Sequence, residues 1–348
     1  MNSSLVWLQR NLFSTPLNSG LTLAALYLLW LVIPPIIEWT FLQATWIGDS
    51  RTACQSNEGA CWAFVDARFS QFIYGLYPEA ERWRVDRAFI LLVILFAALF
   101  VLGFRRSRVV ATILIPYPVV AWLLFYGGIF GLEVVETSQW GGLFLTLVIA
   151  GVGIVASFPL GILLALGRRS RLVVVRSLSV SFIELVRGVP LISVLFMASV
   201  MLPLFLPEGV NFDKLLRALI GITLFQSAYM AEVVRGGLQA IPRGQFEAAE
   251  SLGLSYWRTM RLIILPQALK LVIPGVVNTF IALFKDTTLV MIIGMFDFLG
   301  IVQAATTDPK WLGTAVEGYV FCAAVYWLFC FSMSRYSISV ERKLDTGH

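Results

Sequence analysis

The stretch EAAESLGLSYWRTMRLIILP, residues 247–266, is a charged island between two apolar segments of the chain. Its first residues suit one or two helical turns, and Gly253 suits the position just past a helix end, where a positive φ is needed. Trp257, Met260 and Ile264 follow at helical spacing, which indicates a second, amphipathic helix. We therefore expect two short helices joined at a glycine. Held at a membrane surface, they form a rigid knob that can dock into a groove on another protein.

The composition is that of a polytopic membrane protein. Of the 348 residues, 58% are hydrophobic and only 14% are charged, and no soluble core buries so many apolar side chains. Crossing about 30 Å of hydrocarbon takes about 20 apolar residues in a helix. We therefore predict an all-α fold with about eight transmembrane helices. The predicted spans are 21–42, 88–104, 109–131, 139–166, 182–206, 215–235, 268–295 and 313–333.

The charges of the loops predict how the chain is oriented in the membrane. Arg and Lys gather after the second, fourth, sixth and eighth spans, whereas the opposite loops 132–138 and 296–312 hold at most one base each. Because cytoplasmic loops carry an excess of Arg and Lys, we expect both termini in the cytoplasm. The net charge of +5 follows from this bias and requires no nucleic-acid partner.

A long loop, about residues 43–87, lies on the outer side between the first two predicted spans. It contains several arginines, but long translocated loops tolerate bases better than short ones. Cys54 and Cys61 lie in this loop, seven residues apart. In an oxidising periplasm they can pair as a disulfide, or they can stay unpaired because the geometry does not allow the bond. The sequence leaves both alternatives open.

The charged island resembles the EAA loop of the inner-membrane permease subunits of ATP-binding-cassette (ABC) importers. In that family the loop is a coupling helix that sits in a cleft of the ATPase subunit. The resemblance implies that this chain receives force from a partner ATPase. The residues expected to couple the two are Glu247, Ala248, Ala249, Gly253 and Pro266. The alternative, an ordinary interfacial helix with a glycine cap, is disfavoured by the full pattern between two apolar spans.

Residues 138–343 are similar along their length to the five-helix permease core of polar amino-acid importers of the histidine and glutamine type, with the coupling loop at 235–266. The matching segments are SQWGGLFLTL (138–147), IELVRGVPL (183–191), AEVVRGGLQAIPRGQFEAAESLGLS (231–255) and FKDTTLVMIIG (284–294). The segment GACWAFVDARFSQFIYGLYPEAERWR, residues 59–84, looks like the extended subunits of general L-amino-acid and glutamate/glutamine/aspartate/asparagine permeases. Residues 1–131 would then be an amino-terminal extension with three transmembrane helices and the periplasmic loop 43–87.

The resemblance implies a multi-pass protein of the bacterial inner membrane that moves polar L-amino acids by alternating access. Its expected partners are two ATPase subunits, a periplasmic amino-acid-binding protein and a second permease that is a homologous, non-identical chain. The chain has no G-x-x-x-x-G-K-[ST] phosphate loop, because none of its five lysines precedes Ser or Thr. Its single histidine, His348, supports no metal site or catalytic triad. We therefore expect no enzyme activity, metal or cofactor in this chain, with ATP and Mg²⁺ bound by the ATPase.

Three other functions stay open. An autonomous secondary transporter or channel would take up its cargo without an ATPase, driven by an ion gradient. A non-transporting assembly subunit would only scaffold a partner permease. Within the ABC class, the cargo could be another polar solute. The identity of the amino acid cannot be read from this chain, because selectivity is shared with the binding protein and the partner permease.

Polar residues inside the spans are the candidates for a substrate path, because a charge in the membrane costs about 2.5–3.5 kcal/mol on insertion scales and needs a reason. An amino acid carries a carboxylate and an ammonium, and the Lys285–Asp286 doublet offers a complement to both. The doublet can instead neutralise itself where two permeases meet. The candidate path residues are Lys285, Asp286, Thr287, Thr288, Asn278, Gln226, Tyr229 and Glu232. The last three recur at i, i+3 and i+6, and such a polar stripe can also hold helices together.

Glu184 and Arg187 lie at i, i+3 on one predicted helical face, so they can pair with each other. Pro190 follows three residues later and would open the helical hydrogen-bond ladder nearby. Broken helices in membranes line a cavity more often than they face lipid. We therefore predict a structural and gating role for these three residues.

Overall fold

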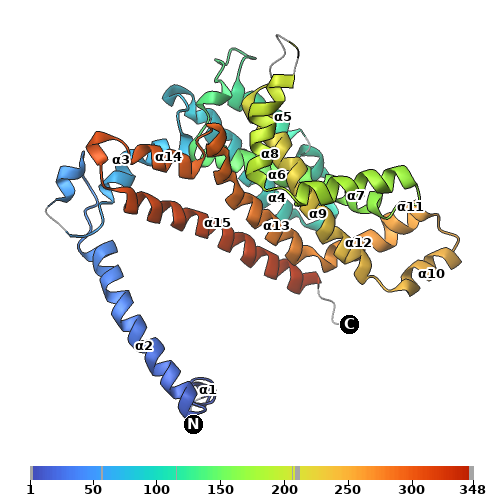
Figure 1. Cartoon of the computed structure of the whole chain (residues 1–348), viewed down its shortest axis with the longest axis horizontal. Helices are drawn as coiled ribbons and strands as arrows, with labels where there is room; N and C mark the ends of the chain where they lie inside the picture. The colour runs from blue at the N-terminus through green and yellow to red at the C-terminus, as the bar shows by residue number, and fades with distance from the viewer. Residues whose placement is uncertain (1–2, 56–57, 115, 206, 208–211, 345–348) are drawn as a thin grey trace. The chain divides into compact units, whose positions relative to one another are not determined.

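The computed structural model describes residues 3–55, 58–114, 116–205, 207 and 212–344. Regular structure in these ranges is helical, apart from three isolated β-bridges. The chain divides into two compact units, Met1–Phe69 with Ala305–Phe321 and Ser70–Ala304 with Cys322–His348. The helices of both units carry their labels in Figure 1.

The larger unit holds most of the membrane helices. Their starts follow local chemistry: Asp213, for example, caps α9 by accepting a hydrogen bond from the backbone N–H of Leu216 at 3.0 Å. Its helices are α4 (Arg82–Leu114), α5 (Tyr117–Tyr126), α6 (Gly142–Arg168), α7 (Val173–Arg187), α8 (Leu191–Phe196), α9 (Lys214–Ala240), α10 (Arg243–Ser251), α11 (Tyr256–Thr259), α12 (Leu265–Leu271), α13 (Ile273–Asp286), α14 (Phe298–Ala305) and most of α15 (Ala315–Leu344). Shorter 3₁₀ and π segments join them: η3 (Glu79–Glu81), η4 (Thr137–Gln139), η5 (Met197–Met201), η6 (Leu202–Phe205), η7 (Met260–Ile264) and η8 (Thr287–Ile293).

The helices α6 and α9 pack closely because small residues of α6 face α9, and they run parallel, since Gly153 and Gly161 meet Ile222 and Met230 in the same order. A Cβ atom on Gly161 would lie 2.6 Å from the Cβ of Met230, and one on Gly153 would lie 3.3 Å from a methyl carbon of Ile222. In a bilayer the hydrophobic effect does not drive helices together, and van der Waals packing stabilises their association instead. Small residues at the interface allow this close packing. Each helix has 27 residues, or about 40 Å at 1.5 Å per residue. The unit therefore has two ends, one at the starts of these helices and one at their carboxyl ends.

Four helices of the described chain are long and apolar enough to cross a membrane: Pro16–Leu42, Gly142–Arg168, Ile273–Ile293 and Ala315–Lys343. The bent pair Val173–Arg187 and Leu191–Phe205 makes a fifth if it counts as one span. The protein is thus an all-helical membrane protein with four to five apolar spans in the described residues. The count of eight stays a prediction.

The span predicted at 182–206 is not one straight helix. Its two parts, α7 and α8, meet at an angle of 105°. Pro190 stands at the break as the residue before α8, and it has no N–H to continue the helical ladder. The bend between α7 and α8 therefore has a local cause, the proline at position 190.

The predicted spans 88–104 and 109–131 also differ from the structure. The helix α4 runs without a break to Leu114, through the arginine-rich residues 105–108 that were predicted as a loop. The following helix, α5, has only ten residues. Gly127, with a φ of +78°, ends it, because a left-handed residue cannot continue a right-handed helix.

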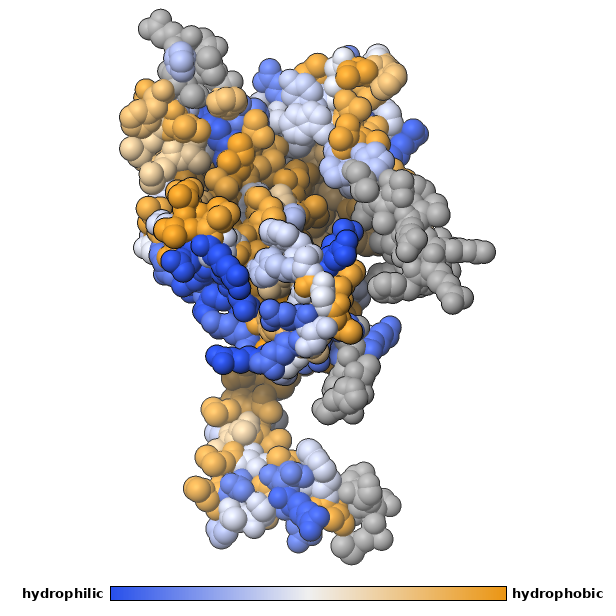
Figure 2. Space-filling model, turned by 90° about the vertical axis from the view of Figure 1, so that its right-hand side faces the viewer, coloured by the Kyte–Doolittle hydropathy of each residue, from blue (hydrophilic) through white to orange (hydrophobic). Residues whose placement is uncertain are grey.

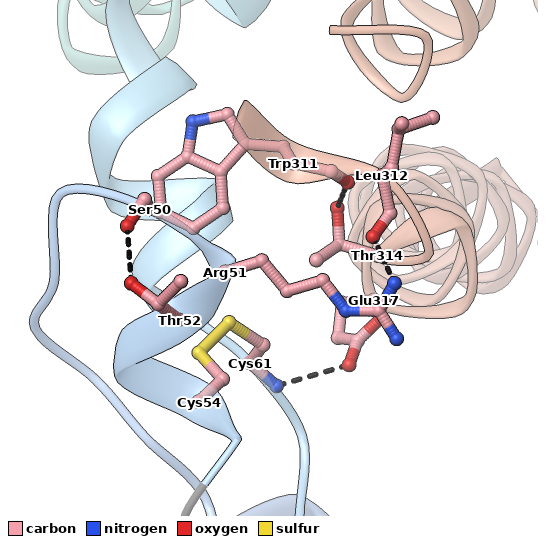
Figure 3. Close-up of a disulfide and its surroundings, with 9 residues drawn as sticks. All are labelled: Ser50, Arg51, Thr52, Cys54, Cys61, Trp311, Leu312, Thr314 and Glu317. Atoms are coloured by element: carbon pink, nitrogen blue, oxygen red, sulfur yellow. Dashed lines mark hydrogen bonds between the residues drawn. A yellow bond between two sulfur atoms is a disulfide. The ribbon is translucent and has the colours of Figure 1, made fainter. Parts of the chain in front are cut away.

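The smaller unit has few long helices and is built around a disulfide between Cys54 and Cys61 (Figure 3). The backbone N–H of Cys61 donates to Oε1 of Glu317 at 3.0 Å. Arg51 donates to the backbone carbonyl of Leu312. The segments of this unit are α1 (Ser3–Asn11), α2 (Pro16–Ile37), η1 (Glu38–Leu42), η2 (Arg51–Cys54), the first part of α3 (Ala63–Tyr74), η9 (Pro309–Trp311) and the start of α15.

Two further contacts fasten the same two stretches of this unit. Arg68 forms an ion pair with Asp308, and the ring of Phe64 packs 5.7 Å from that of Trp311, centroid to centroid. The outer loop predicted between the first two spans is therefore fixed, through its residues 51–68, to the segment that leads into α15.

Candidate functional site

The coupling segment, which we define as residues 243–264, folds as two helical pieces joined at a glycine. After α10 the chain turns at Gly253, whose φ is +70°. The N–H of Gly253 donates to the carbonyl of Glu250 at 2.9 Å, and the N–H of Leu254 donates to that of Ala249 at 3.1 Å. These bonds satisfy the last carbonyls of α10, so the turn is a regular helix end with its glycine in the left-handed region. Pro266 lies in the first turn of α12.

The two alanines of the Glu-Ala-Ala sequence face opposite ways. Ala249 is 1% exposed, whereas Glu247 and Ala248 are exposed. Leu252, just before the glycine, is 76% exposed. Figure 2 looks onto the side of the molecule that carries α10 and α11 in Figure 1, and shows hydrophilic side chains gathered around apolar ones. An apolar tip beside charged groups is typical of a protein-docking surface.

The second amphipathic piece differs from the prediction in one residue. Met260 and Ile264 are buried, but Trp257 is 68% exposed. Trp257 lies on the four-residue helix α11, whereas Met260 and Ile264 begin and end the π-helical stretch η7, Met260–Ile264. The 3.6-residue spacing therefore does not describe this segment throughout, because a π-helix has i→i+5 hydrogen bonds. Trp257 and Leu252 thus add apolar surface to the knob that the sequence pattern did not reveal.

The coupling segment is tied to α6 and α9 by side chains at their carboxyl ends. The guanidinium of Arg169 lies 5.7 Å from the ring centroid of Phe246 on α10, and its Nη1 donates to the carbonyl of Leu238 at 3.1 Å. A hollow of about 420 Å³ lies between these elements, lined by Arg169, Leu238, Gln239, Ile241, Arg243, Phe246 and Glu247. The helix α10 is therefore linked through Arg169 to the carboxyl ends of α6 and α9.

Glu232 on α9 is the centre of a charge cluster at the same end of the unit. Its carboxylate lies 2.8 Å from Arg168 of α6, 3.5 Å from Arg187 of α7 and 2.7 Å from Arg235 of α9. Glu184 pairs with Arg168 at 2.9 Å. The pairing of Glu184 with Arg187 along α7 is thus replaced by contacts across helices. Glu184 reaches Arg168 on α6, and Arg187 reaches Glu232 on α9. These ion pairs hold the ends of α6, α7 and α9 together.

The stripe Gln226, Tyr229 and Glu232 does not line one surface. Gln226 is 3% exposed and its Nε2 donates to the carbonyl of Thr279 on α13 at 2.7 Å, so it joins two helices. Tyr229 is 38% exposed, and the guanidinium of Arg187 lies 5.7 Å from its ring centroid. Glu232 belongs to the charge cluster.

The helix α13 carries an exposed stripe that includes two of the candidate path residues. Asn278, Ala282 and Lys285 are exposed at i, i+4 and i+7, a spacing that places them on one helical face. Thr287 and Thr288 bond to the backbone, donating to the carbonyls of Phe284 at 2.8 Å and Lys285 at 2.9 Å. The two hydroxyls are therefore used locally.

Asp286 is half-buried at the end of α13, where the chain tightens into the 3₁₀ segment η8. Asn278 and Lys285 are the exposed polar side chains of α13. In the described residues no group of three His, Cys, Asp or Glu side chains is placed to hold a metal ion.

Apolar spans, a helix broken at Pro190 and a bent segment between two apolar stretches are features of a membrane transport component. Residues 157–345 match the family described as "Binding-protein-dependent transport system inner membrane component". The chain belongs to this family: it is a multi-pass permease component of an ABC transport system in the inner membrane. It is not an enzyme, because ATP is bound by a separate ATPase subunit of the transporter and solute is delivered by a binding protein.

Two curated relatives match nearly the whole chain. It is 60% identical to the "Inner membrane amino-acid ABC transporter permease protein YhdY" of Escherichia coli (strain K12), over 99% of this chain and 95% of the relative. It is 42% identical to the "Glutamate/glutamine/aspartate/asparagine transport system permease protein BztC" of Rhodobacter capsulatus, over 98% and 94%. A solved structure, "Crystal structure of an amino acid ABC transporter with histidines", contains a chain that is 30% identical, with a TM-score of 0.52, covering 58% of this chain and 92% of that one.

Proposed function

We propose that the chain is the permease of an ABC-type importer that carries polar L-amino acids across the inner membrane by alternating access. The observation that carries the proposal is the match to YhdY over almost the full length of both chains. The name of that relative gives amino acids as its cargo, and the name of BztC gives four polar ones. The likeness extends through the amino-terminal part, which the shorter five-helix permeases lack.

The coupling segment receives the work of ATP hydrolysis. Two ATPase subunits close on ATP, and each presses on one permease at the exposed residues Glu247, Ala248 and Leu252. Gly253 keeps the two pieces bent, while buried Ala249 holds α10 on the helices beneath it. The force then reaches α6, α7 and α9, whose ends meet at the Glu232 charge cluster.

The gate and the path follow from the same arrangement. The bend at Pro190 lets α8 turn relative to α7, and Glu184 and Arg187 hold the end of α7 to its neighbours. On α13, Lys285 and Asn278 face the path or the partner permease, with Asp286 beside them. An amino acid passing this helix meets a cation for its carboxylate.

The assembly contains a second, homologous permease chain, as the extended permeases that this chain resembles work in pairs. Residues 138–343 form the core that pairs and residues 1–131 the extension. Both termini lie in the cytoplasm, since Arg168 and Arg169 at the end of α6 lie beside the coupling segment and cytoplasmic loops carry an excess of Arg and Lys. The Cys54–Cys61 disulfide then lies in the periplasm, where disulfides persist.

Reconstitution tests this proposal. The permease, its partner and the ATPase subunits are placed in proteoliposomes with ATP on the coupling side and the amino-acid-loaded binding protein on the other. Uptake of L-glutamine or L-glutamate that requires ATP and both other components is expected. Uptake by the single chain driven by an ion gradient would identify a secondary transporter, and ATP-driven uptake of another polar solute alone would correct the cargo.

A further inference from the structure

A second cavity lies at the other end of the larger unit, at the starts of α6 and α9. Its volume is about 370 Å³, within the range of about 300–1,000 Å³ that small-molecule sites occupy. We call it the outer pocket. It is lined by Leu76, Tyr126, Glu136, Thr137, Ser138, Trp140, Asp213, Lys214, Leu215, Gly294, Met295 and Phe296.

The lining of the outer pocket contains the cation of Lys214 and the carboxylates of Glu136 and Asp213, and Lys214 forms no ion pair with either carboxylate. Lys214 is exposed and makes no ion pair with the residues that the structure describes. Its ammonium lies over Gly294, since a Cβ atom on that glycine would be 3.7 Å from Nζ. Glu136 is exposed, and within the described residues its carboxylate accepts one long hydrogen bond, 3.4 Å, from the hydroxyl of Ser138. Both charged groups are therefore available to a ligand.

The position of Lys214 is unfavourable for folding alone. It is the first residue of α9, and the dipole of a helix disfavours a cation at its amino terminus. The preceding residue, Asp213, already provides the negative charge that a helix start favours. Its carboxylate caps α9 and also accepts a hydrogen bond from the hydroxyl of Thr137. An anion bound beside Lys214 would offset this unfavourable interaction. The dipole of α9 would attract the same anion.

The walls of the outer pocket are preformed. The N–H of Val135 donates to the carbonyl of Tyr126 at 2.8 Å, and the indole N–H of Trp140 donates to the carbonyl of Val135 at 3.2 Å. Tyr77 donates to the carbonyl of Phe125 at 2.8 Å, and burial raises the pKa of its hydroxyl to about 12, so it stays a donor. These bonds fix the aromatic wall before any ligand arrives.

We propose that the outer pocket binds a free zwitterionic amino acid before it enters the membrane path. The α-carboxylate pairs with Lys214, the ammonium pairs with Glu136, and the side chain lies against Trp140 and Tyr126. The inference rests on the proposed function, because it takes the cargo and the outer orientation from there. Leu76 and Tyr126 belong to the amino-terminal part of the chain, so the site requires the extension as well as the core.

The charges also predict selectivity. The pocket holds one ammonium, on Lys214, and two carboxylates, on Glu136 and Asp213. A neutral amino acid presents one charge of each sign, whereas a dicarboxylic one adds a second negative charge beside the acidic groups. L-glutamine therefore binds more tightly than L-glutamate.

The test measures binding of tritiated L-glutamine and L-glutamate to the intact transporter in nanodiscs, without binding protein. Lys214→Gln and Glu136→Gln each weaken glutamine binding by about tenfold, since a charged hydrogen bond is lost. The double variant with Lys214→Glu and Glu136→Lys recovers most of it. The matched controls Lys310→Gln and Glu133→Gln, at exposed residues outside the pocket, bind like the unaltered protein.

Equal binding by the single variants and the unaltered protein, or no glutamine binding at all, overturns the inference. So does a loss of ATPase stimulation by the binding protein with amino-acid binding intact, which would make the pocket a docking surface. ATP-driven uptake of amino acids by the unaltered transporter is measured in parallel. If uptake is absent, the proposed function fails; if uptake is present and pocket variants bind normally, only the outer pocket fails.

Discussion

The carboxylate of Glu232 on α9 lies 2.8 Å from the guanidinium of Arg168 at the end of α6. Two more arginines, Arg187 and Arg235, share the same carboxylate. One acidic group thus holds three cations from three helices at the end of the unit that carries the coupling segment. Any movement of α10 that reaches α6 and α9 has to displace this cluster or carry it along as a body.

Replacing Glu232 with Gln removes the carboxylate that all three arginines share and leaves Glu184 beside Arg168. Because the groups are partly exposed, water screens the loss, and we expect the transporter to lose roughly 1 kcal/mol of stability. The melting temperature of the detergent-solubilised complex falls at low salt, and the difference narrows at high salt. Glu341→Gln, at an exposed position of α15, should change neither value. Equal melting of Glu232→Gln and the unaltered protein at low salt would contradict this role.

The turn of the coupling segment depends on Gly253. A side chain at a φ of +70° costs about 1–2 kcal/mol, so Gly253→Ala straightens or loosens the turn. We expect ATP hydrolysis by the assembled transporter to persist while amino-acid uptake falls several-fold. Gly236→Ala is the control, because a Cβ there meets nothing within 4 Å and the residue lies inside α9. Normal uptake per ATP in Gly253→Ala would show that the bend is not needed.

Substitutions at Ala248 and Ala249 separate an effect on stability from an effect on ATPase binding. Ala249 is buried, so Ala249→Leu overpacks its surroundings and destabilises the protein by about 1–3 kcal/mol. Ala248→Leu adds its side chain to an exposed surface; the permease keeps its stability but binds the ATPase more weakly. Thermal melting and copurification of the ATPase are measured on both variants. The same effect of both variants on melting would mean that Ala248 is not on the docking face.

The exposed stripe on α13 predicts a loss of transport without a loss of assembly. Lys285→Gln removes its cation, and we expect uptake to fall by about tenfold, the value of one charge-assisted hydrogen bond. Lys270→Gln on α12 is the matched control, since that lysine is also exposed. Subunit composition is checked by size-exclusion chromatography. Unchanged uptake in Lys285→Gln would remove this residue from the path and leave it a contact between permeases.

The local features of the coupling segment were predictable from sequence because they depend on neighbouring residues. A glycine after a helical stretch indicates a left-handed turn, and the structure has Gly253 at positive φ. The exposure of Trp257 was not predictable, because helical spacing shows which residues share a face but not how much of that face the rest of the protein covers. The family could be recognised from the same local motifs, and the comparisons confirm it.

Contacts between segments that are distant in the chain could not be predicted from the sequence. Glu184 and Arg187 fit an i, i+3 pair, yet each finds its partner on another helix. Helical spacing shows which residues share a face but not which helix covers that face. The outer pocket was missed for the same reason: its lining comes from five separate stretches of chain, and only Lys214, a cation at a helix start, gave a local signal.

The central claim is that the coupling segment transmits force from an ATPase, and crosslinking tests it most directly. A photoreactive amino acid replaces Leu252, the exposed tip beside the bend, in the assembled transporter. Illumination should join the permease to the ATPase subunit, with a yield that changes between the nucleotide-free and ATP-bound states. Crosslinks to lipid alone, or a permease that accumulates amino acid with no ATPase present, would contradict the account.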